Sequence, residues 1–248
     1  MHMTNREPQT WKPRQVNELT IAANLPPVGM AEDATYLTER RRKRILNALN
    51  NRTRRITVLL EDIYDPLNGN AVLRTADGLG IQDVYIAENR HAFNVHPKVS
   101  GRASAWLTLY RFRAAGGIQK QDYRVKPEGI QDATRQAYAS LRSSGYTIIA
   151  TSPRGNSISL RELDISKKYA IALGSEHWGL SDWAIENADM SVALPMLGFT
   201  ESYNISVTAA MILHYLSERL RFETNDWGLT EKEKAALWET WTARKSRG

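Results

Sequence analysis

The sequence predicts an α/β fold in which a mainly parallel sheet is covered by helices on both faces. Two observations lead to this prediction. From residue 56 onward, short apolar runs of strand length recur along the chain, and stretches with helical periodicity lie between them. Strands that alternate with helices in this way usually form parallel sheets, because each helix carries the chain back to the starting edge of the sheet. Helical extensions are expected before and after this region.

Each element of the sheet region is expected from its own pattern. The strands are Ile56–Leu60, Val84–Ala87, Trp106–Phe112, Thr147–Thr151, Tyr169–Leu173 and Ser191–Leu194. The helices are Asn70–Leu79, Gly129–Ser143, Ser181–Asn187 and Asn204–Arg221. Residues 113–128 contain two glycines and a proline, which favours an exposed loop.

The two ends of the chain show different patterns. Residues 1–34 contain four prolines and little periodicity, which indicates a loosely structured arm with a short helix near Val16–Ala23. Thr35 is a candidate cap for a helix that runs to about Asn50. The apolar side of that helix is Leu37, Ile45, Leu46 and Leu49. From Glu231 to Arg244 an amphipathic helix carries Leu237, Trp238 and Trp241 on one side, and these tryptophans either pack in a core or stack on bases.

Composition excludes several classes of protein. With 248 residues, of which 42% are hydrophobic, the chain can bury a sizeable core. No apolar run approaches the roughly 20 residues of a membrane span, and the first residues lack the apolar core of a secretion signal. There are no cysteines, and the five histidines are not spaced as ligands on a helix face, so no metal is expected. A cytoplasmic location is the simplest interpretation.

Positive charge is concentrated near the start of the predicted sheet region. The formal net charge is only +6, but eight basic residues lie between positions 40 and 55. They are Arg40, Arg41, Arg42, Lys43, Arg44, Arg52, Arg54 and Arg55. Such a cluster suits a polyanion such as RNA, and the alternative is an ordinary solvated helix face.

Familiar catalytic and nucleotide-binding motifs are absent. The sequence contains neither G-x-G-x-x-G nor G-x-x-x-x-G-K-[ST], so a dinucleotide or a P-loop nucleotide site is not expected. The hydrolase motif G-x-S-x-G is missing as well. Any chemistry must therefore lie in other segments.

Three polar segments follow predicted strands. The first, after Ile56–Leu60, is N-G-N-A-V-L-R-T-A-D, which begins at Asn68 and contains Arg74. Asn68 is a candidate helix cap. Arg74 stands between apolar residues, so its guanidinium either pairs with a neighbouring aspartate or binds an anion.

The second segment, G-S-E-H-W-G-L, runs from Gly174 to Leu180 and follows the strand Tyr169–Leu173. Gly174 lets the backbone approach a ligand closely, and ligands of parallel sheets bind at the carboxyl ends of strands. The third segment, L-P-M-L-G-F-T-E-S-Y-N-I-S-V, starts at Leu194 and leads into a long apolar helix. Ser202 and Asn204 are candidate caps for that helix, and the exposed amides beside them suit a carboxylate. Taken alone, the second segment also fits an ordinary strand-to-helix turn, and in the third segment the alternative is that Ser202 and Asn204 act only as caps.

In this order and spacing, the three segments resemble the SPOUT superfamily, and specifically its SpoU/TrmH branch of tRNA and rRNA ribose 2′-O-methyltransferases. The matching patterns are N-x-x-x-x-x-R-T-A-D, G-x-E-x-x-G-L and L-P-M-x-G followed by S-x-N-x-S-V. The resemblance covers roughly residues 35–222. It implies a homodimer with a deep trefoil knot, at about residues 150–210, that binds S-adenosylmethionine without a metal.

The resemblance also implies roles for individual residues. Thr151, Gly174, Leu194, Met196, Ser202 and Asn204 are expected to hold the cofactor. Arg74 is expected to be the catalytic residue, with Asn68, Glu176, Ser202 and Asn204 completing the catalytic site. A guanidinium is essentially never deprotonated, so we expect Arg74 to hold a phosphate and stabilise the 2′-oxyanion rather than act as a base.

The class of substrate is inferred from the length of the two terminal extensions. Residues 1–55 form a short basic arm and helix for RNA binding, residues 56–222 the methyltransferase domain, and residues 223–248 a helical extension. Short extensions of this kind resemble the tRNA enzymes that methylate guanosine 18 of the D-loop. The alternatives are methylation of 23S rRNA or another tRNA position, and an RNA-binding protein with an inactive knot.

Overall fold

The computed structural model describes residues 37–114, 131–153 and 157–243. The chain divides into two compact units, one formed by Asn50–Thr230 and the other by the two terminal segments, Met1–Leu49 and Glu231–Gly248. The predicted helix at Val16–Ala23 and most of the predicted loop at 113–128 lie outside the described residues.

The larger unit is built on a sheet of six parallel strands. They are β1 (Ile56–Glu61), β2 (Asp83–Glu88), β3 (Thr108–Arg113), β4 (Tyr146–Thr151), β5 (Lys168–Leu173) and β6 (Met190–Val192). Their spatial order is β3-β2-β1-β5-β4-β6, and every neighbouring pair is parallel. The prediction of a parallel sheet is confirmed, and each predicted strand agrees with the observed one to within two residues at either end.

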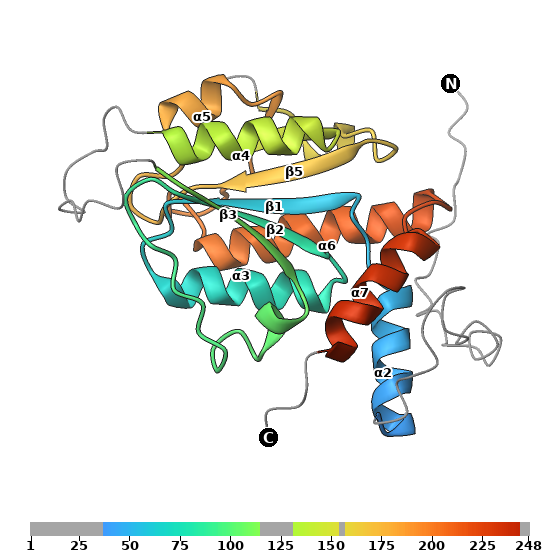
Figure 1. Cartoon of the computed structure of the whole chain (residues 1–248). Coiled ribbons are helices and arrows are strands. Elements are labelled where there is room, and N and C mark those ends of the chain that lie inside the picture. Colours follow the sequence, from blue (N-terminus) through green and yellow to red (C-terminus); the bar gives the residue numbers. More distant parts are fainter. Residues whose placement is uncertain (1–36, 115–130, 154–156, 244–248) are drawn as a thin grey trace, which may run out of the picture. The chain divides into compact units, whose positions relative to one another are not determined.

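Helices cover both faces of the sheet, as predicted. They are α3 (Pro66–Gly78), α4 (Asp132–Ser143), α5 (Asp182–Glu186) and α6 (Ile205–Glu223), with short 3₁₀ turns η1 (Ala103–Ala105) and η2 (Leu160–Glu162). Figure 1 shows α3 and α6 on one face of the sheet and α4 and α5 on the other.

Two apolar cores result from the alternation of side chains along each strand. Val58 and Leu60 of β1 are buried in a cluster that contains apolar residues of α3 and α6. Leu59, between them, is buried in a second cluster that contains Tyr138 of α4 and Ala184 of α5. β1 is therefore buried on both faces, which is why it forms a continuous apolar run in the sequence.

The start of α3 differs from the prediction. Asn68 was expected to cap the helix, but Asp65 does so, because its side chain accepts a hydrogen bond of 2.8 Å from the backbone N–H of Leu67. Pro66 occupies the first helical position, where a missing N–H costs nothing. The cap prediction for Asn68 is therefore wrong, and its side chain is available for another contact.

The terminal unit contains α2 (Glu39–Asn50) and α7 (Glu231–Ala243). The hydroxyl of Thr38 accepts a hydrogen bond from the backbone N–H of Arg41, so Thr38 begins α2, and Thr35 lies outside the described residues. The predicted apolar side of α2 is buried at Ile45, Leu46 and Leu49. Leu237, Trp238 and Trp241 of α7 are also buried, which favours packing over base stacking for the two tryptophans.

The strand order reverses between β1 and β5. From β1 the chain first builds outward through β2 and β3, and it later places β5 on the other side of β1. Open α/β sheets bind ligands beyond the carboxyl ends of the strands at such a switch point. The segments that follow β1 and β5 are therefore where a site is expected.

Candidate active site

A chain of hydrogen bonds connects the three polar segments that the sequence singled out. Asn68, in the first turn of α3, donates from Nδ2 to Oε1 of Glu176 at 2.9 Å. Asn204, just before α6, donates from Nδ2 to Oδ1 of Asn68 at 3.0 Å. Residues 68, 176 and 204 thus come together at the carboxyl edge of the sheet, although more than a hundred residues separate the first from the second.

Glu176 is held by a tight turn after β5. Ser175 and Gly179 exchange two backbone hydrogen bonds, of 3.0 and 2.9 Å, which close the turn. Gly174 lies so close to this turn that a Cβ there would be 2.0 Å from the carbonyl carbon of Gly179. The second carboxylate oxygen of Glu176 accepts from the backbone N–H of Tyr64 at 3.1 Å, so the turn is joined to the segment after β1.

Asn204 has two functions in this arrangement. Its Oδ1 caps α6 by accepting from the backbone N–H of Ser206 at 2.8 Å and from the hydroxyl of Ser206 at 2.6 Å. The same side chain donates to Asn68, so the cap that the sequence predicted also orients the polar network. Ser202 is exposed, and it forms no hydrogen bond with any residue in the described ranges.

A buried carboxyl that sequence reasoning missed is hydrogen-bonded to Ser181, which directly follows the segment Gly174–Leu180. Glu61 ends β1 and is only 2% exposed. Its carboxylate accepts from the hydroxyls of Thr134 and Ser181 at 2.6 and 2.9 Å, and from the backbone N–H of Ser181 at 2.8 Å. Burial raises the pKa of Glu61, against the opposing effect of these hydrogen bonds. The available signal was an acidic residue at the end of an apolar strand.

Arg74 is exposed on α3, less than two turns beyond Asn68. The alternative prediction, a pair with a neighbouring aspartate, does not hold, since Asp77 pairs with the buried Arg52 instead. Among the described residues, none forms a hydrogen bond or an ion pair with the Arg74 guanidinium. An exposed cation without a partner, on the helix that also carries Asn68, is suited to bind an anionic ligand.

Comparison with known proteins agrees with this geometry. The sequence model of the SpoU rRNA Methylase family matches residues 55–214. The chain belongs to the SpoU methylase family. It is 37% identical to a tRNA (guanosine(18)-2′-O)-methyltransferase of Borreliella burgdorferi over 82% of this chain and 84% of that protein. A Thermus thermophilus enzyme of the same description is 34% identical over 71% of this chain and 81% of its own length.

Solved structures of SpoU proteins share the fold. The crystal structure of the A. aeolicus TrmH/SpoU tRNA modifying enzyme matches with a TM-score of 0.67 and 25% identity, over 85% of this chain and 98% of that one. The SpoU methyltransferase AviRb from Streptomyces viridochromogenes, in complex with the cofactor AdoMet, matches with a TM-score of 0.53 and 22% identity. That match covers 71% of this chain and 62% of AviRb.

Three of the eight basic residues expected to bind RNA form ion pairs or hydrogen bonds within the SpoU domain. Arg52 is buried, pairs with Asp77 and donates to the carbonyl of Ile81 at 3.0 Å. Arg54 pairs with Asp83 at 3.0 Å. Arg55 donates to the backbone carbonyls of Ser166 and Asp226. These contacts give the guanidinium groups of Arg52, Arg54 and Arg55 structural roles, and RNA binding by these three residues stays a prediction.

The other five basic residues lie on α2 and present their charge to solvent. Arg40, Arg42, Lys43 and Arg44 are exposed, and Arg41 is half-buried. Lys43 forms an ion pair of 2.7 Å with Glu39, one turn away. The segment Arg40–Arg44 therefore retains the character of a cationic surface.

The loops expected to hold a cofactor lie at the carboxyl ends of β4, β5 and β6. The hydroxyl of Thr151 donates to the carbonyl of Ala172 at 2.8 Å and ties β4 to β5. Leu194 and Met196 are half-buried, yet from residue 194 to 203 the backbone makes no hydrogen bond within the described part of the chain. Backbone amides and carbonyls without partners in the protein are suited to bind a polar ligand.

Within 37–114, 131–153 and 157–243, no three histidine, aspartate or glutamate side chains gather in a way that would hold a metal ion. No helix in the same ranges is both long and apolar enough to cross a membrane.

Proposed function

We propose that the protein is an S-adenosylmethionine-dependent tRNA guanosine-18 ribose 2′-O-methyltransferase. The observation that carries the proposal is the network of Asn68, Glu176 and Asn204, together with an unpaired Arg74 on the helix that carries Asn68. The described activity of the relatives from Borreliella burgdorferi and Thermus thermophilus supports the substrate.

The residues at the carboxyl edge of the sheet fit S-adenosylmethionine. The backbone from Leu194 to Tyr203 has free donors and acceptors for an adenine and an amino-acid group. Thr151, Gly174, Leu194, Met196, Ser202 and Asn204 are the proposed cofactor-binding residues. When bound, the cofactor supplies a methyl group already activated by its sulfonium, and the AdoMet complex of AviRb supports its use in this fold.

Arg74 is the proposed catalytic residue. Its guanidinium stays protonated, so it would bind the phosphate beside the target ribose and stabilise negative charge as it develops on the 2′-oxygen. Asn68, Glu176 and Asn204 would act mainly by orienting the reactants, since these three side chains are already joined to one another by hydrogen bonds. Such positioning of the hydroxyl and the methyl donor contributes several kcal/mol to catalysis in general.

We also propose that the loops after β4, β5 and β6 form a deep trefoil knot and that the protein is a homodimer. Family membership supports both. For the dimer, Val207 and Met211 of α6 are four residues apart and expose apolar surface on one side of the helix. We therefore place α6 at the proposed interface.

The proposed organisation has an RNA-binding segment before the catalytic domain. Residues 1–55 would bind tRNA through Arg40–Arg44, residues 56–222 would carry out the reaction, and residues 223–248 would extend it. The compact unit Asn50–Thr230 supports a catalytic domain of about this extent. Contacts from arginine and lysine to phosphates would position the tRNA without reading its sequence.

The decisive experiment supplies labelled S-adenosylmethionine and two tRNA transcripts that differ by one atom. One transcript has an ordinary guanosine at position 18, and the other has 2′-deoxyguanosine there. We expect label in the first transcript only, at nucleotide 18. Label at another nucleotide, or only in ribosomal RNA, would contradict the substrate, and a failure of the protein to bind the cofactor would favour the non-catalytic RNA-binding alternative.

A variant tests the proposed catalytic residue. Arg74→Ala should lower the rate of methyl transfer by about 10²–10³-fold, as expected for removal of one group that stabilises an oxyanion. Its affinity for S-adenosylmethionine, measured by calorimetry, should stay within about twofold, because Arg74 lies on α3 and not in the cofactor loops. Arg161→Ala, which removes an exposed charge elsewhere, is the control. Full activity of the Arg74 variant would refute the role.

A further inference from the structure

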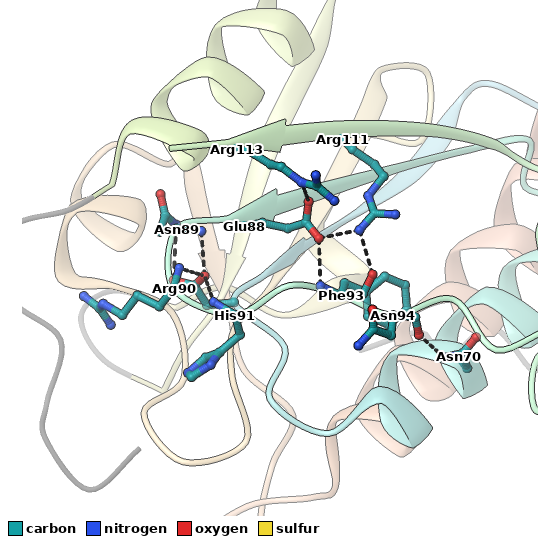
Figure 2. A network of polar contacts seen from close by, with 10 residues as sticks. Asn70, Glu88, Asn89, Arg90, His91, Phe93, Asn94, Arg111 and Arg113 are labelled. Carbon is teal, nitrogen blue, oxygen red and sulfur yellow. Dashed lines mark hydrogen bonds and ion pairs between the residues drawn. The ribbon is translucent and has the colours of Figure 1, made fainter. Parts of the chain in front are cut away.

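The connection between β2 and β3, residues 89–107, is fixed at its start by a buried carboxylate. Glu88 ends β2 and is fully buried. It accepts hydrogen bonds from the backbone N–H of Phe93 at 2.7 Å and from Arg111 and Arg113 of β3, whose guanidinium groups converge on it in Figure 2. Arg111 also donates to the carbonyl of Phe93 at 2.7 Å. The backbone of Phe93 is thus held at both its N–H and its C=O.

Asn70 fixes the next part of the connection. This side chain of α3 is fully buried, and its Nδ2 donates to the carbonyls of Pro66 and Asn94 at 2.7 and 2.9 Å. Its Oδ1 accepts from the backbone N–H of His96 at 2.8 Å. Figure 2 shows Asn70 reaching from its helix to Asn94. One amide group therefore ties the connection to the helix that carries Asn68 and Arg74.

The tied connection brings its backbone against Arg74. Gly101 and Arg102 both have positive φ angles, of 59° and 66°. A Cβ added at Gly101 would lie 3.6 Å from Nε of Arg74, which is ordinary contact distance. An arginine rarely adopts the left-handed conformation, so a strained residue, Arg102, directly follows the glycine that lies near the proposed catalytic guanidinium.

The same stretch adds exposed positive charge. Lys98 and Arg102 are exposed, and within the described residues neither side chain forms a hydrogen bond or an ion pair. Arg102 directly follows Gly101, the glycine that lies near Arg74, and Lys98 precedes that glycine by three residues. Three cations without partners therefore belong to one region of the surface, and phosphate is the anion that RNA presents at regular spacing.

We propose that residues 96–102 form part of the RNA-binding site, in which Lys98 and Arg102 bind phosphates next to the target ribose. Asn70 is the positioning residue, since it determines where this loop stands relative to Arg74. The proposal rests on the proposed function and deepens it. It identifies a phosphate-binding loop on the catalytic domain, separate from the cationic segment Arg40–Arg44.

The first test compares two double variants that remove the same charge. Lys98→Ala/Arg102→Ala changes the loop, and Arg161→Ala/Lys167→Ala removes two exposed cations elsewhere on the domain. We expect the loop variant to bind tRNA roughly tenfold more weakly, with a slope of log Kd against log salt reduced by about 2, and to bind S-adenosylmethionine normally. Equal tRNA affinities and slopes for the two variants would overturn the proposal.

The second test asks whether Asn70 acts through the loop. Asn70→Ala is combined with Lys98→Ala/Arg102→Ala, and tRNA affinity is measured for each variant and for the combination. If Asn70 only supports the fold, the effects add, and that result would overturn its positioning role. If Asn70 positions Lys98 and Arg102, then Asn70→Ala should change tRNA affinity little in the variant that already lacks these two cations. Hydrogen exchange should also show faster exchange at His96 in Asn70→Ala.

The two proposals fail in different ways. If the wild-type protein neither binds nor methylates tRNA, the proposed function is wrong, and the loop proposal fails with it. If the wild-type protein methylates tRNA and the loop variant behaves like its charge-matched control, only the loop proposal is wrong. Because Lys98 and Arg102 are exposed, the loop variant is expected to fold even if Asn70→Ala does not.

Discussion

Gly174 offers a sharp test of how the site is built. It follows β5 and precedes the turn that carries Glu176. In Gly174→Ala, the new methyl carbon would lie 2.0 Å from the carbonyl carbon of Gly179 and 2.1 Å from the backbone nitrogen of Leu180. Both are backbone atoms, so no side-chain rotation relieves the clash, and the turn itself must move.

The size of the effect follows from the contacts that the turn makes. Ordinary contact begins at 3.4 Å, so Gly179 has to shift by more than about 1 Å. That movement breaks the two hydrogen bonds between Ser175 and Gly179, each contributing about 1 kcal/mol, and adds the cost of overpacking. We expect the free energy of unfolding to fall by about 2–4 kcal/mol. Glu176 loses its alignment with Asn68, so cofactor affinity and activity should fall as well.

Urea unfolding and calorimetric titration of S-adenosylmethionine measure these two effects. Gly78→Ala is the matched control, because a Cβ there meets nothing within 4 Å. As Gly78 is the last residue of a helix, its substitution should leave stability unchanged or raise it by about 0.5–1 kcal/mol. If Gly174→Ala unfolds and binds the cofactor like the control, the close packing of this turn is not what shapes the site.

Three further predictions concern charged residues. Because burial raises the pKa of Glu61, the folded protein binds this proton more tightly than the unfolded chain. Stability from this group is thus complete below the ordinary carboxyl pKa of 4.5 and is lost as pH rises through the raised value, and urea titrations of Glu61→Gln should lack that loss. Arg52→Ala should lower the free energy of unfolding by about 2–3 kcal/mol, because it leaves Asp77 without its partner. Replacing Arg40–Arg44 by alanine should weaken tRNA binding in filter assays instead, with unfolding changed by less than about 0.5 kcal/mol. Unaltered stability of the Arg52 variant, or unaltered tRNA binding of the Arg40–Arg44 variant, would contradict this division of roles.

The strands and most helices could be predicted from the sequence, because their burial requires apolar residues in a local, periodic pattern. β1, for example, is apolar on both faces, and a helical pattern follows it. The order of the strands in the sheet does not appear in any local pattern of residues. Nothing within Ile56–Leu60 indicates that this strand pairs with Tyr169–Leu173, and that pairing creates the switch point where the site lies.

The site residues were recognisable as motifs, but their contacts were not. The pattern around Asn68 looks like a helix start, and only the structure shows that Asp65 is the cap and that Asn68 reaches Glu176. The contacts of the basic cluster at positions 40–55 were not recognisable from the sequence either. Charge and spacing do not distinguish Arg52, which is buried against an aspartate, from Arg42, which faces solvent, because the partner Asp77 is 25 residues away.

The pairing of β1 with β5 has a consequence for how the protein is made. β2 emerges from the ribosome soon after β1 and can pair with it early, whereas β5 is synthesised more than a hundred residues later. During that interval one long edge of an apolar strand has no neighbour, and such edges readily recruit strands of other chains. Contacts this distant in sequence also slow folding. The arrangement that creates the binding edge therefore leaves the nascent chain prone to aggregation until β5 has been translated.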